Sequence, residues 1–314
     1  MKLVVLDGYT LNPGDLSWQP LETFGDLTVY DRTKPEQVVE RIKDADIVIL
    51  NKVEMTREFL AEAKQLKYIT ILATGYDHVD LKAAKEMGIV VSNVPTYGTD
   101  SVAQFTMALI LELAHQIGQY SEAVKAGAWI ESEDWTFNLT PQMELMGKTL
   151  GIIGYGRIGQ RVGALAQAFG MKVLTIKRTG RNLDIPALSM DELLAQSDIV
   201  SLHCPLTPET EGIINQNSLK KMKPTALLIN SSRGPLIVEE DLRNALNAGQ
   251  IAGAAVDVVA REPMEEKHPF LEAENLLITP HIAWSSKEAR NRIMETTQEN
   301  ISKFLEDYPI NQVN

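Results

Sequence analysis

Short apolar runs alternate with helix-like segments along the first hundred residues of the chain. The runs are continuous stretches of Val, Ile and Leu, which is typical of strands that helices cover on both faces of a parallel sheet. Segments such as Pro35–Lys43 and Thr56–Gln65 separate them and are interpreted as helices. This βαβ rhythm predicts a small doubly wound α/β domain. The expected strands are Leu3–Leu6, Leu27–Tyr30, Ile47–Leu50, Ile69–Leu72 and Ile89–Val91.

The same alternation begins again in the second half of the chain and predicts a second doubly wound parallel sheet. It follows a looser segment, Gly127–Lys148, that carries several aromatic residues. The expected strands are Leu150–Ile153, Val173–Ile176, Ile199–Leu202, Ala226–Ile229, Ala254–Val258 and Leu276–Ile278.

Two long helices are expected to connect the two sheets. One begins at Ser101, where Ser101 and Gln104 form a capping box, and the other begins at Ser285 and runs through Leu305. Because no strand follows the last helix, we expect it to return to the first domain. The predicted domains are residues 1–98 plus 287–314 and residues 99–286, with a ligand cleft between the sheets at the carboxyl ends of their strands.

Composition excludes several classes of protein. The 314 residues are 44% hydrophobic and 23% charged, which is ample for a folded core and argues against disorder. A net charge of −12 opposes binding to nucleic acid, which needs clustered cations. The single cysteine, Cys204, and an N-terminus without a long apolar run predict a cytoplasmic protein that does not contact the membrane.

Gly154, Gly156 and Gly159 form a G-x-G-x-x-G pattern directly after the expected strand Leu150–Ile153. Glycines there permit a tight turn and close approach of a pyrophosphate, and the N–H groups of Arg157 and Ile158 at the helix start would meet its negative charge. An ordinary glycine-rich turn is the alternative interpretation. The strand before it and the helix after it favour a dinucleotide site.

The residues after the next strand bear on which dinucleotide binds. An NAD site would place Asp or Glu there to accept hydrogen bonds from the ribose hydroxyls. The chain instead has Lys177, Arg178, Thr179 and Arg181, which suit the 2′-phosphate of NADP. A solvated basic loop, or use of both cofactors, is the alternative. The sequence therefore favours NADP(H) over NAD(H).

Position along the chain distinguishes the five histidines. His281 follows the last expected strand, in the short loop before the final helix, where a proton donor to a bound substrate is expected. His203, at the end of Ile199–Leu202, is a reserve candidate. His78 lies in a loop assigned to substrate, while His115 and His268 are expected to be structural or solvated.

Arg233 and Glu262 follow neighbouring strands of the second sheet. Each alone would be interpreted as half of a surface ion pair, but together with His281 they match the reduction of a 2-oxo acid. That reaction needs a cation for the carboxylate, a proton donor for the developing alkoxide, and a carboxylate that orients the donor. A zinc-dependent dehydrogenase or hydrolase is disfavoured because one Cys and scattered His offer no metal-ligand spacing.

These residues belong to motifs that resemble the D-isomer-specific 2-hydroxyacid dehydrogenase family along nearly the whole chain. Within the family the chain looks most like the glycerate dehydrogenases, also called hydroxypyruvate reductases, in Leu6–Tyr9, Asn12–Asp15 and Trp284. The family motifs are Ala73–Asp80, Asn93–Pro95, the glycine loop, Ser232–Gly234, Asp257–Val258 with Glu262–Pro263, and Pro280–Trp284.

The resemblance implies a flavodoxin-like substrate domain, a Rossmann cofactor domain, and a role for each matched residue. His281 is the implied general acid, Glu262 its partner, and Arg233 the group that binds the substrate carboxylate. Backbone groups of Thr74, Gly75 and Tyr76 would bind the carboxylate from the other side. Implied cofactor contacts, besides Thr74, His281 and the residues given above, are Gln104, His203, Cys204, Pro205, Ser231, Ser232 and Asp257.

The resemblance further implies reduction of hydroxypyruvate, and of glyoxylate, to D-glycerate and glycolate. It also implies a homodimer formed through the cofactor domains, with the helix from Ser101 at the interface. Lys177 departs from the acidic residue of many members and puts NAD preference in doubt. The alternatives are another substrate of the family, such as phosphoglycerate, lactate, formate or phosphite, and a nucleotide-sensing corepressor with little turnover.

Overall fold

The chain divides into two compact units in the computed structural model, which describes residues 1–177 and 184–314. Unit 1 comprises Met1–Gly98 and Ser285–Asn314, and unit 2 comprises Thr99–Trp284. The chain therefore passes between the units at 98–99 and 284–285, whereas the sequence placed the second boundary at 286–287.

Unit 1 contains a five-stranded sheet in which every neighbouring pair of strands is parallel. The order β2-β1-β3-β4-β5 is the 2-1-3-4-5 order of flavodoxin-like folds, so the predicted class is confirmed for this unit. The strands are β1 (Lys2–Val5), β2 (Asp26–Val29), β3 (Ile47–Leu50), β4 (Tyr68–Ile71) and β5 (Val90–Ser92).

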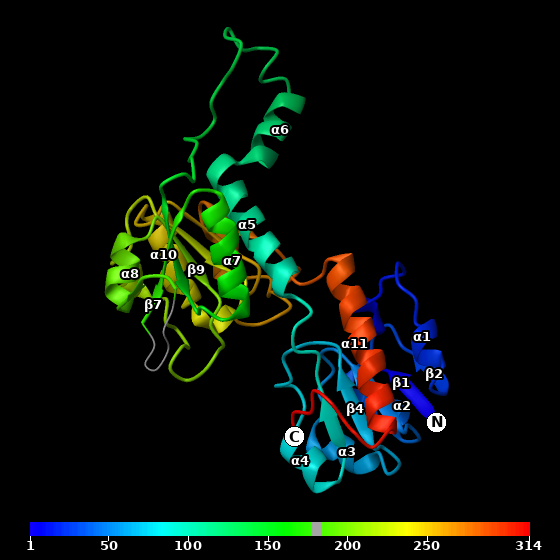
Figure 1. The fold of residues 1–314 in the computed structure, drawn as a ribbon. Helices are drawn as coiled ribbons and strands as arrows, with labels where there is room; N and C mark the ends of the chain where they lie inside the picture. Colours follow the sequence, from blue (N-terminus) through cyan, green and yellow to red (C-terminus); the bar gives the residue numbers. More distant parts are fainter. Residues whose placement is uncertain (178–183) are drawn as a thin grey trace. The chain divides into compact units, whose positions relative to one another are not determined.

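Helices cover both faces of this sheet, as continuous apolar strands require. Side chains such as Val48 and Leu50 pack with α2 (Pro35–Ile42), α3 (Arg57–Glu62) and α4 (Leu81–Glu86) in one core. The long helix α11 (Lys287–Leu305) contacts β4, and Phe304 stacks on Tyr68 with ring centroids 4.2 Å apart (Figure 1). A short helix, α1 (Gln19–Glu22), precedes β2.

The final helix begins one residue later than the sequence predicted. Ser286, not Ser285, is the N-cap, and its hydroxyl accepts a hydrogen bond from Ala289 N at 3.2 Å. Both serines are followed three residues later by a residue compatible with a first helical turn, so the sequence could not choose between them. The return of this helix to the first sheet agrees with the prediction.

Unit 2 contains a seven-stranded parallel sheet of order β12-β11-β10-β9-β6-β7-β8. Numbered within the unit, β8-β7-β6-β9-β10-β11 is the 3-2-1-4-5-6 order of dinucleotide-binding folds, and the order reverses between β6 and β9. β8 has two residues and was not predicted, because so short a run carries no period. The strands are β6 (Thr149–Ile153), β7 (Lys172–Ile176), β8 (Ala187–Leu188), β9 (Ile199–Leu202), β10 (Leu227–Asn230), β11 (Gly253–Val256) and β12 (Leu276–Ile278).

Alternate residues of the unit 2 strands pack into two different cores. On β10, Leu227 and Ile229 pack with α5 (Thr99–His115) and α7 (Arg157–Ala168), while Leu228 packs with helices of the other face. Those helices are α8 (Met190–Gln196), α9 (Gln216–Leu219) and α10 (Glu239–Asn247). Together the two sheets confirm the predicted class, an α/β protein with two doubly wound parallel sheets.

The start of α5 corrects another predicted cap. The helix begins at Thr99, so Ser101 lies inside its first turn and does not cap it. The Ser101 hydroxyl instead donates to Ala283 O at 2.8 Å, which ties α5 to the loop that follows β12. A serine near the start of a helix can donate to a carbonyl group elsewhere instead of capping the helix, and only the tertiary structure shows which of the two it does.

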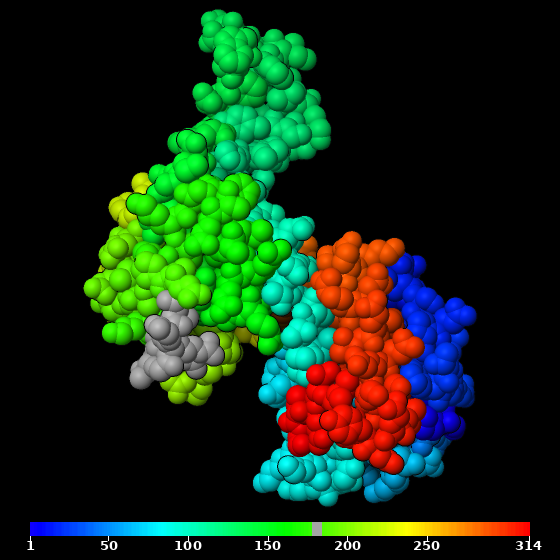
Figure 2. Space-filling view, viewed as in Figure 1, coloured from blue at the N-terminus to red at the C-terminus, as the bar shows by residue number. Residues whose placement is uncertain are grey.

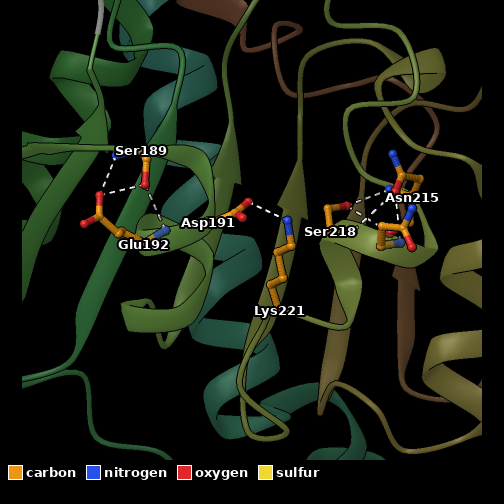
Figure 3. A network of polar contacts seen from close by, with 7 residues as sticks. Ser189, Asp191, Glu192, Asn215, Ser218 and Lys221 are labelled. Atoms are coloured by element: carbon orange, nitrogen blue, oxygen red, sulfur yellow. Dashed lines mark hydrogen bonds and ion pairs between the residues drawn. The ribbon is translucent and has the colours of Figure 1, made fainter.

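Side-chain caps fix the helices on the outer face of unit 2. Ser189 and Glu192 form a capping box at the start of α8, and Asn215 accepts hydrogen bonds from the N–H groups at the start of α9 (Figure 3). Asp191 of α8 pairs with Lys221, just after α9, at 2.6 Å. These contacts hold the two helices side by side.

An extended segment projects from unit 2, formed by α6 (Ile117–Lys125) and the chain that follows it (Figures 1 and 2). We call residues 117–139 the arm. Its side chains leave a large apolar surface exposed: Trp135 is 86% exposed and Ile130 is 89% exposed. Among the described residues, no helix is both long and apolar enough to cross a membrane.

Candidate active site

Each of the three glycines after β6 meets a different structural requirement of the loop. Gly154 has φ +103°, and a Cβ there would lie 2.3 Å from Cys204 N and 2.4 Å from His203 C. A Cβ on Gly159 would lie 2.3 Å from Gly154 O, inside the turn itself. Gly156 is exposed, and a Cβ there would meet no atom within 4 Å. The first and third glycines therefore close the turn, while the second leaves open space above it.

This geometry fits a dinucleotide. Gly156 is the N-cap of α7, so the N–H groups of Arg157 and Ile158 belong to the first helical turn, whose donors have no acceptor within the helix. The positive end of the helix dipole favours a phosphate at this point. The loop also lies at the carboxyl end of β6, beside the position where the strand order reverses.

The segment expected to select the cofactor begins at Lys177, which is exposed and directly follows β7. Its backbone N–H donates to Leu188 O at 2.8 Å and thereby continues the pairing of β7 with β8. Arg178, Thr179 and Arg181, which the sequence analysis placed beside it, lie outside the described residues.

His203, Cys204 and Pro205 follow β9, which neighbours β6. His203 N donates to Ile153 O at 2.7 Å, and its Nε2 lies 2.8 Å from Ser201 Oγ. Burial lowers the pKa of His203 to about 4 and raises the pKa of the Cys204 thiol. His203 is therefore neutral at physiological pH, which suits a wall of a binding site better than proton transfer.

Glu262 and His281 meet in a short ion pair. His281 Nδ1 lies 2.6 Å from Glu262 Oε2, and the two side chains are 32% and 38% exposed, respectively. Since Nδ1 faces the carboxylate, Nε2 is the nitrogen left to exchange a proton with a ligand. His281 has φ +55°, a left-handed conformation that is uncommon for a residue other than glycine.

Asp257 holds the loop that carries His281. Its Oδ1 accepts hydrogen bonds from Thr279 Oγ1 at 2.6 Å and Ile282 N at 2.9 Å, and its Oδ2 accepts from Ala283 N at 2.8 Å. His281 N also donates to Asp257 O at 2.7 Å. Burial raises the pKa of this carboxyl, and the three hydrogen bonds to it oppose that rise. The sequence analysis assigned Asp257 only to the cofactor and missed this anchoring contact.

Arg233 is exposed at the end of β10, the strand beside β11. Its guanidinium donates through one nitrogen to Ser232 O at 2.8 Å. The neighbouring serines are fixed: Ser232 Oγ donates to Cys204 O at 2.7 Å, and Ser231 Oγ lies 3.0 Å from Thr106 Oγ1 of α5. Arg233, Glu262 and His281 thus follow three adjacent strands, β10, β11 and β12, at the carboxyl ends of the strands.

The remaining predicted residues lie on two other elements. Gln104 is exposed on α5, one turn after Ser101. In unit 1, Thr74, Gly75 and Tyr76 follow β4, and Thr74 Oγ1 donates to Val94 O at 2.8 Å while Thr74 O accepts from Asn93 Nδ2 at 2.8 Å. The structure therefore fixes the start of this loop against the segment after β5.

The remaining three histidines lie on other elements. His115 Nδ1 lies 2.8 Å from Gln142 Oε1. His268 is buried and caps the 3-10 helix Pro269–Glu272 by accepting from Phe270 N, so of the two expected roles, structural or solvated, it has the structural one. Burial and then the charge of Lys52 lower the pKa of His78 to about 4. Within the described ranges, no group of three or more His, Cys, Asp or Glu side chains could hold a metal ion.

Comparisons with known proteins place this site in a family. The sequence model of the D-isomer specific 2-hydroxyacid dehydrogenase NAD-binding domain matches residues 107–283. A hydroxypyruvate reductase of Blautia hydrogenotrophica is 51% identical over the full length of both chains. A glycerate dehydrogenase of Methylorubrum extorquens is 40% identical over 89% of this chain and 88% of its own.

A solved structure supports the same family assignment. An acyclic imino acid reductase in complex with NADPH and D-Arg is 33% identical and superposes over all of both chains with a TM-score of 0.87. The glycine loop has the geometry of a dinucleotide site, and the contact between Glu262 and His281 lies at the carboxyl end of the same sheet. The chain thus belongs to the D-isomer specific 2-hydroxyacid dehydrogenase family and is an oxidoreductase with a domain that binds a nicotinamide dinucleotide.

Proposed function

We propose that the protein reduces hydroxypyruvate to D-glycerate and, as a second substrate, glyoxylate to glycolate. The observation that carries the proposal is the 2.6 Å contact between His281 Nδ1 and Glu262 Oε2, on the strand ends next to Arg233. The names of the two relatives, hydroxypyruvate reductase and glycerate dehydrogenase, support this choice of substrate.

His281 acts as the general acid. When bound, a reduced nicotinamide would supply hydride to C2 of the 2-oxo acid. His281 holds a proton on Nε2 and delivers it to the oxygen on C2, where negative charge develops, while Glu262 favours the imidazolium form and fixes the ring through Nδ1. The left-handed backbone at His281, fixed by the hydrogen bonds to Asp257, keeps Nε2 in a set direction.

Arg233 binds the carboxylate of the substrate. A guanidinium has five N–H donors, and the contact with Ser232 O occupies one side of it, so donors remain for a bidentate contact with a carboxylate. Asp257, Gln104 and the serines beside Arg233 contribute to the nicotinamide end of the cofactor site.

We further propose that the protein prefers NADP(H). Lys177 stands after β7, where an acidic residue would otherwise accept hydrogen bonds from the adenosine ribose. A cation at this position attracts a 2′-phosphate, but it cannot accept a hydrogen bond from a ribose hydroxyl. The structural neighbour that binds NADPH is consistent with this preference.

We propose that two copies associate through their cofactor domains, with the arm at the interface next to α5. Exposed apolar patches of this kind are typical of protein interfaces. Ile117, Trp129, Ile130 and Trp135 are each more than half exposed. The double variant Ile130→Glu/Trp135→Glu should dissociate a dimer in light scattering, whereas Tyr308→Glu, at an exposed site of unit 1, should not. A monomeric wild type would contradict the proposal.

Steady-state kinetics test the function. Oxidation of NADPH and of NADH is measured with hydroxypyruvate, glyoxylate and pyruvate. The expected result is the highest kcat/KM for hydroxypyruvate with NADPH. Equal rates with NADH would refute only the cofactor preference, and turnover of pyruvate above hydroxypyruvate would refute the proposed substrate.

A further inference from the structure

The loop Asp257–Pro263, which we call the Glu262 loop, must hold Glu262 against His281. Within it, Val259 N donates to Glu262 Oε1 at 3.3 Å, so one carboxylate oxygen faces the loop and the other faces His281. From outside, Gly234 packs against it: a Cβ on Gly234 would lie 1.9 Å from Val259 C and 2.1 Å from Val259 O. Backbone contact thus joins the Glu262 loop to the turn that carries Arg233.

Glu239 makes a second contact with this loop. It is the first residue of α10, and its Oε1 accepts a hydrogen bond from Ala260 N at 2.7 Å. Its side chain is only 16% exposed. Since Ala260 lies two residues before Glu262, this hydrogen bond fixes the backbone directly before the acidic residue.

His268 faces the other oxygen of Glu239 without a hydrogen bond of good geometry. His268 Nε2 lies 3.2 Å from Glu239 Oε2, and its side chain is 6% exposed. Phe270 N donates to His268 Nδ1 at 3.2 Å, so Nδ1 is an acceptor and Nε2 carries the hydrogen in the neutral ring. Glu239 is the acidic group that this buried N–H faces.

We propose that Glu239 is a positioning residue for the reaction, acting through the Glu262 loop. Its carboxylate accepts from Ala260 N on one side and faces the N–H of His268 on the other, so that Glu262 stays at the distance at which it supports His281. The base of Glu239 is rigid, because Val238 N donates to Ile214 O and Ile214 N donates to Leu236 O. The inference rests on the proposed roles of Glu262 and His281.

Glu239→Gln tests the proposal with little change in size. A carboxylate accepts on both oxygens, but an amide accepts on one and donates on the other. If the amide nitrogen faces Ala260 N–H, that N–H loses its acceptor. If the amide nitrogen faces His268 Nε2–H instead, two donors meet in a buried place. Glu240→Gln is the matched control, because Glu240 is the next residue of α10, is exposed, and pairs only with Arg243 in the contacts of the described chain.

We expect Glu239→Gln to lower kcat with hydroxypyruvate by roughly tenfold or more, which is the loss of rate expected when a catalytic group is displaced. The change in KM should be smaller. The pH at which reduction falls to half on the alkaline side should move down, as in a variant of Glu262. Hydrogen exchange of the peptide that covers 257–263 should accelerate in the substrate-free protein. Glu240→Gln should match the wild type in all three measurements.

Two variants of His268 separate positioning from general destabilisation. His268→Gln retains an N–H donor near the place of Nε2, while His268→Asn retains an acceptor for Phe270 N and loses the donor to Glu239. We expect the Asn variant to show the larger decrease in kcat and the faster exchange of 257–263. A Glu239→Gln protein whose pH profile and loop exchange equal those of Glu240→Gln would overturn the proposal. The exchange measurement needs no substrate, so it still decides the structural part if hydroxypyruvate is not turned over.

Discussion

Replacing Glu262 with Gln tests the acid–base pair most directly. The change removes one negative charge 2.6 Å from His281 Nδ1 and keeps the size of the side chain. Reduction needs the imidazolium form of His281, which the negative charge stabilises. The variant should therefore lose reductase activity at a lower pH than the wild type, on the alkaline side of the profile.

The strength of the contact between the two side chains follows from their distance and their exposure. At 2.6 Å, Coulomb's law gives about 1.6 kcal/mol with the dielectric constant of water and about 3 kcal/mol at half that value. Since the two side chains are 32% and 38% exposed, solvent screens the pair and the lower figure applies.

The assay is the pH dependence of kcat/KM for NADPH oxidation with hydroxypyruvate, repeated for the reverse oxidation of D-glycerate. Oxidation needs neutral His281, so the rising limb of the reverse reaction should move to lower pH by the same amount. Glu265→Gln, in the same exposed segment, is the control. Profiles of Glu262→Gln that coincide with the wild type in both directions would refute the role assigned to Glu262.

Three further predictions concern the arginine that binds the substrate, the glycine loop and a partly buried histidine. Arg233→Ala should lower kcat/KM by roughly a hundredfold or more, which is the loss expected when one partner of a close charge pair is removed. Arg261→Ala is the control and should leave kcat/KM unchanged. A loss under tenfold for Arg233→Ala in steady-state kinetics would contradict the assignment. Gly154→Ala should lower the melting temperature because its Cβ meets Cys204 N at 2.3 Å, while Gly156→Ala should keep the melting temperature and weaken NADPH binding in a fluorescence titration. Stability should fall as pH decreases from about 6.5 towards 4, because the pKa of His203 is about 4 in the folded chain and the unfolded chain takes up the proton first. In urea titrations at pH 7 and pH 5, His203→Gln should lose less stability between the two pH values than the wild type, and an equal loss would exclude His203 as the cause.

The strands, apart from the two-residue β8, could be predicted because they depend on patterns within short segments. Continuous apolar runs mark strands covered on both faces, and the glycine loop identifies the strand at which the order of the second sheet reverses. The caps at Ser101 and Ser285 were wrong for a different reason. A serine near a helix start can cap it or can bond elsewhere, and Ser101 donates to Ala283, which is distant in sequence.

The residue types of the site could be predicted, but the means by which they are held could not. Arg233, Glu262 and His281 follow strands, and the residues after the carboxyl ends of parallel strands can be recognised from the sequence as candidates for a site. Asp257 was expected to contact only a ligand, yet its carboxylate accepts three hydrogen bonds from the loop of His281. Two of these contacts join the side chain to backbone N–H groups 25 and 26 residues away, and a backbone donor leaves no signature in the sequence.

This difference explains why substitutions around the site should act unequally. The acid–base pair is partly exposed, so removal of a charge there changes proton affinity more than folding. Asp257 and Gly234 are buried and contact backbone, so substitution there should disturb the fold and the reaction together. Glu239 lies between these cases, because it is partly buried and touches the Glu262 loop through a single backbone N–H. A conservative change at Glu239 can therefore move the catalytic carboxylate while the domain stays folded, which makes it the position where geometry and stability can be separated.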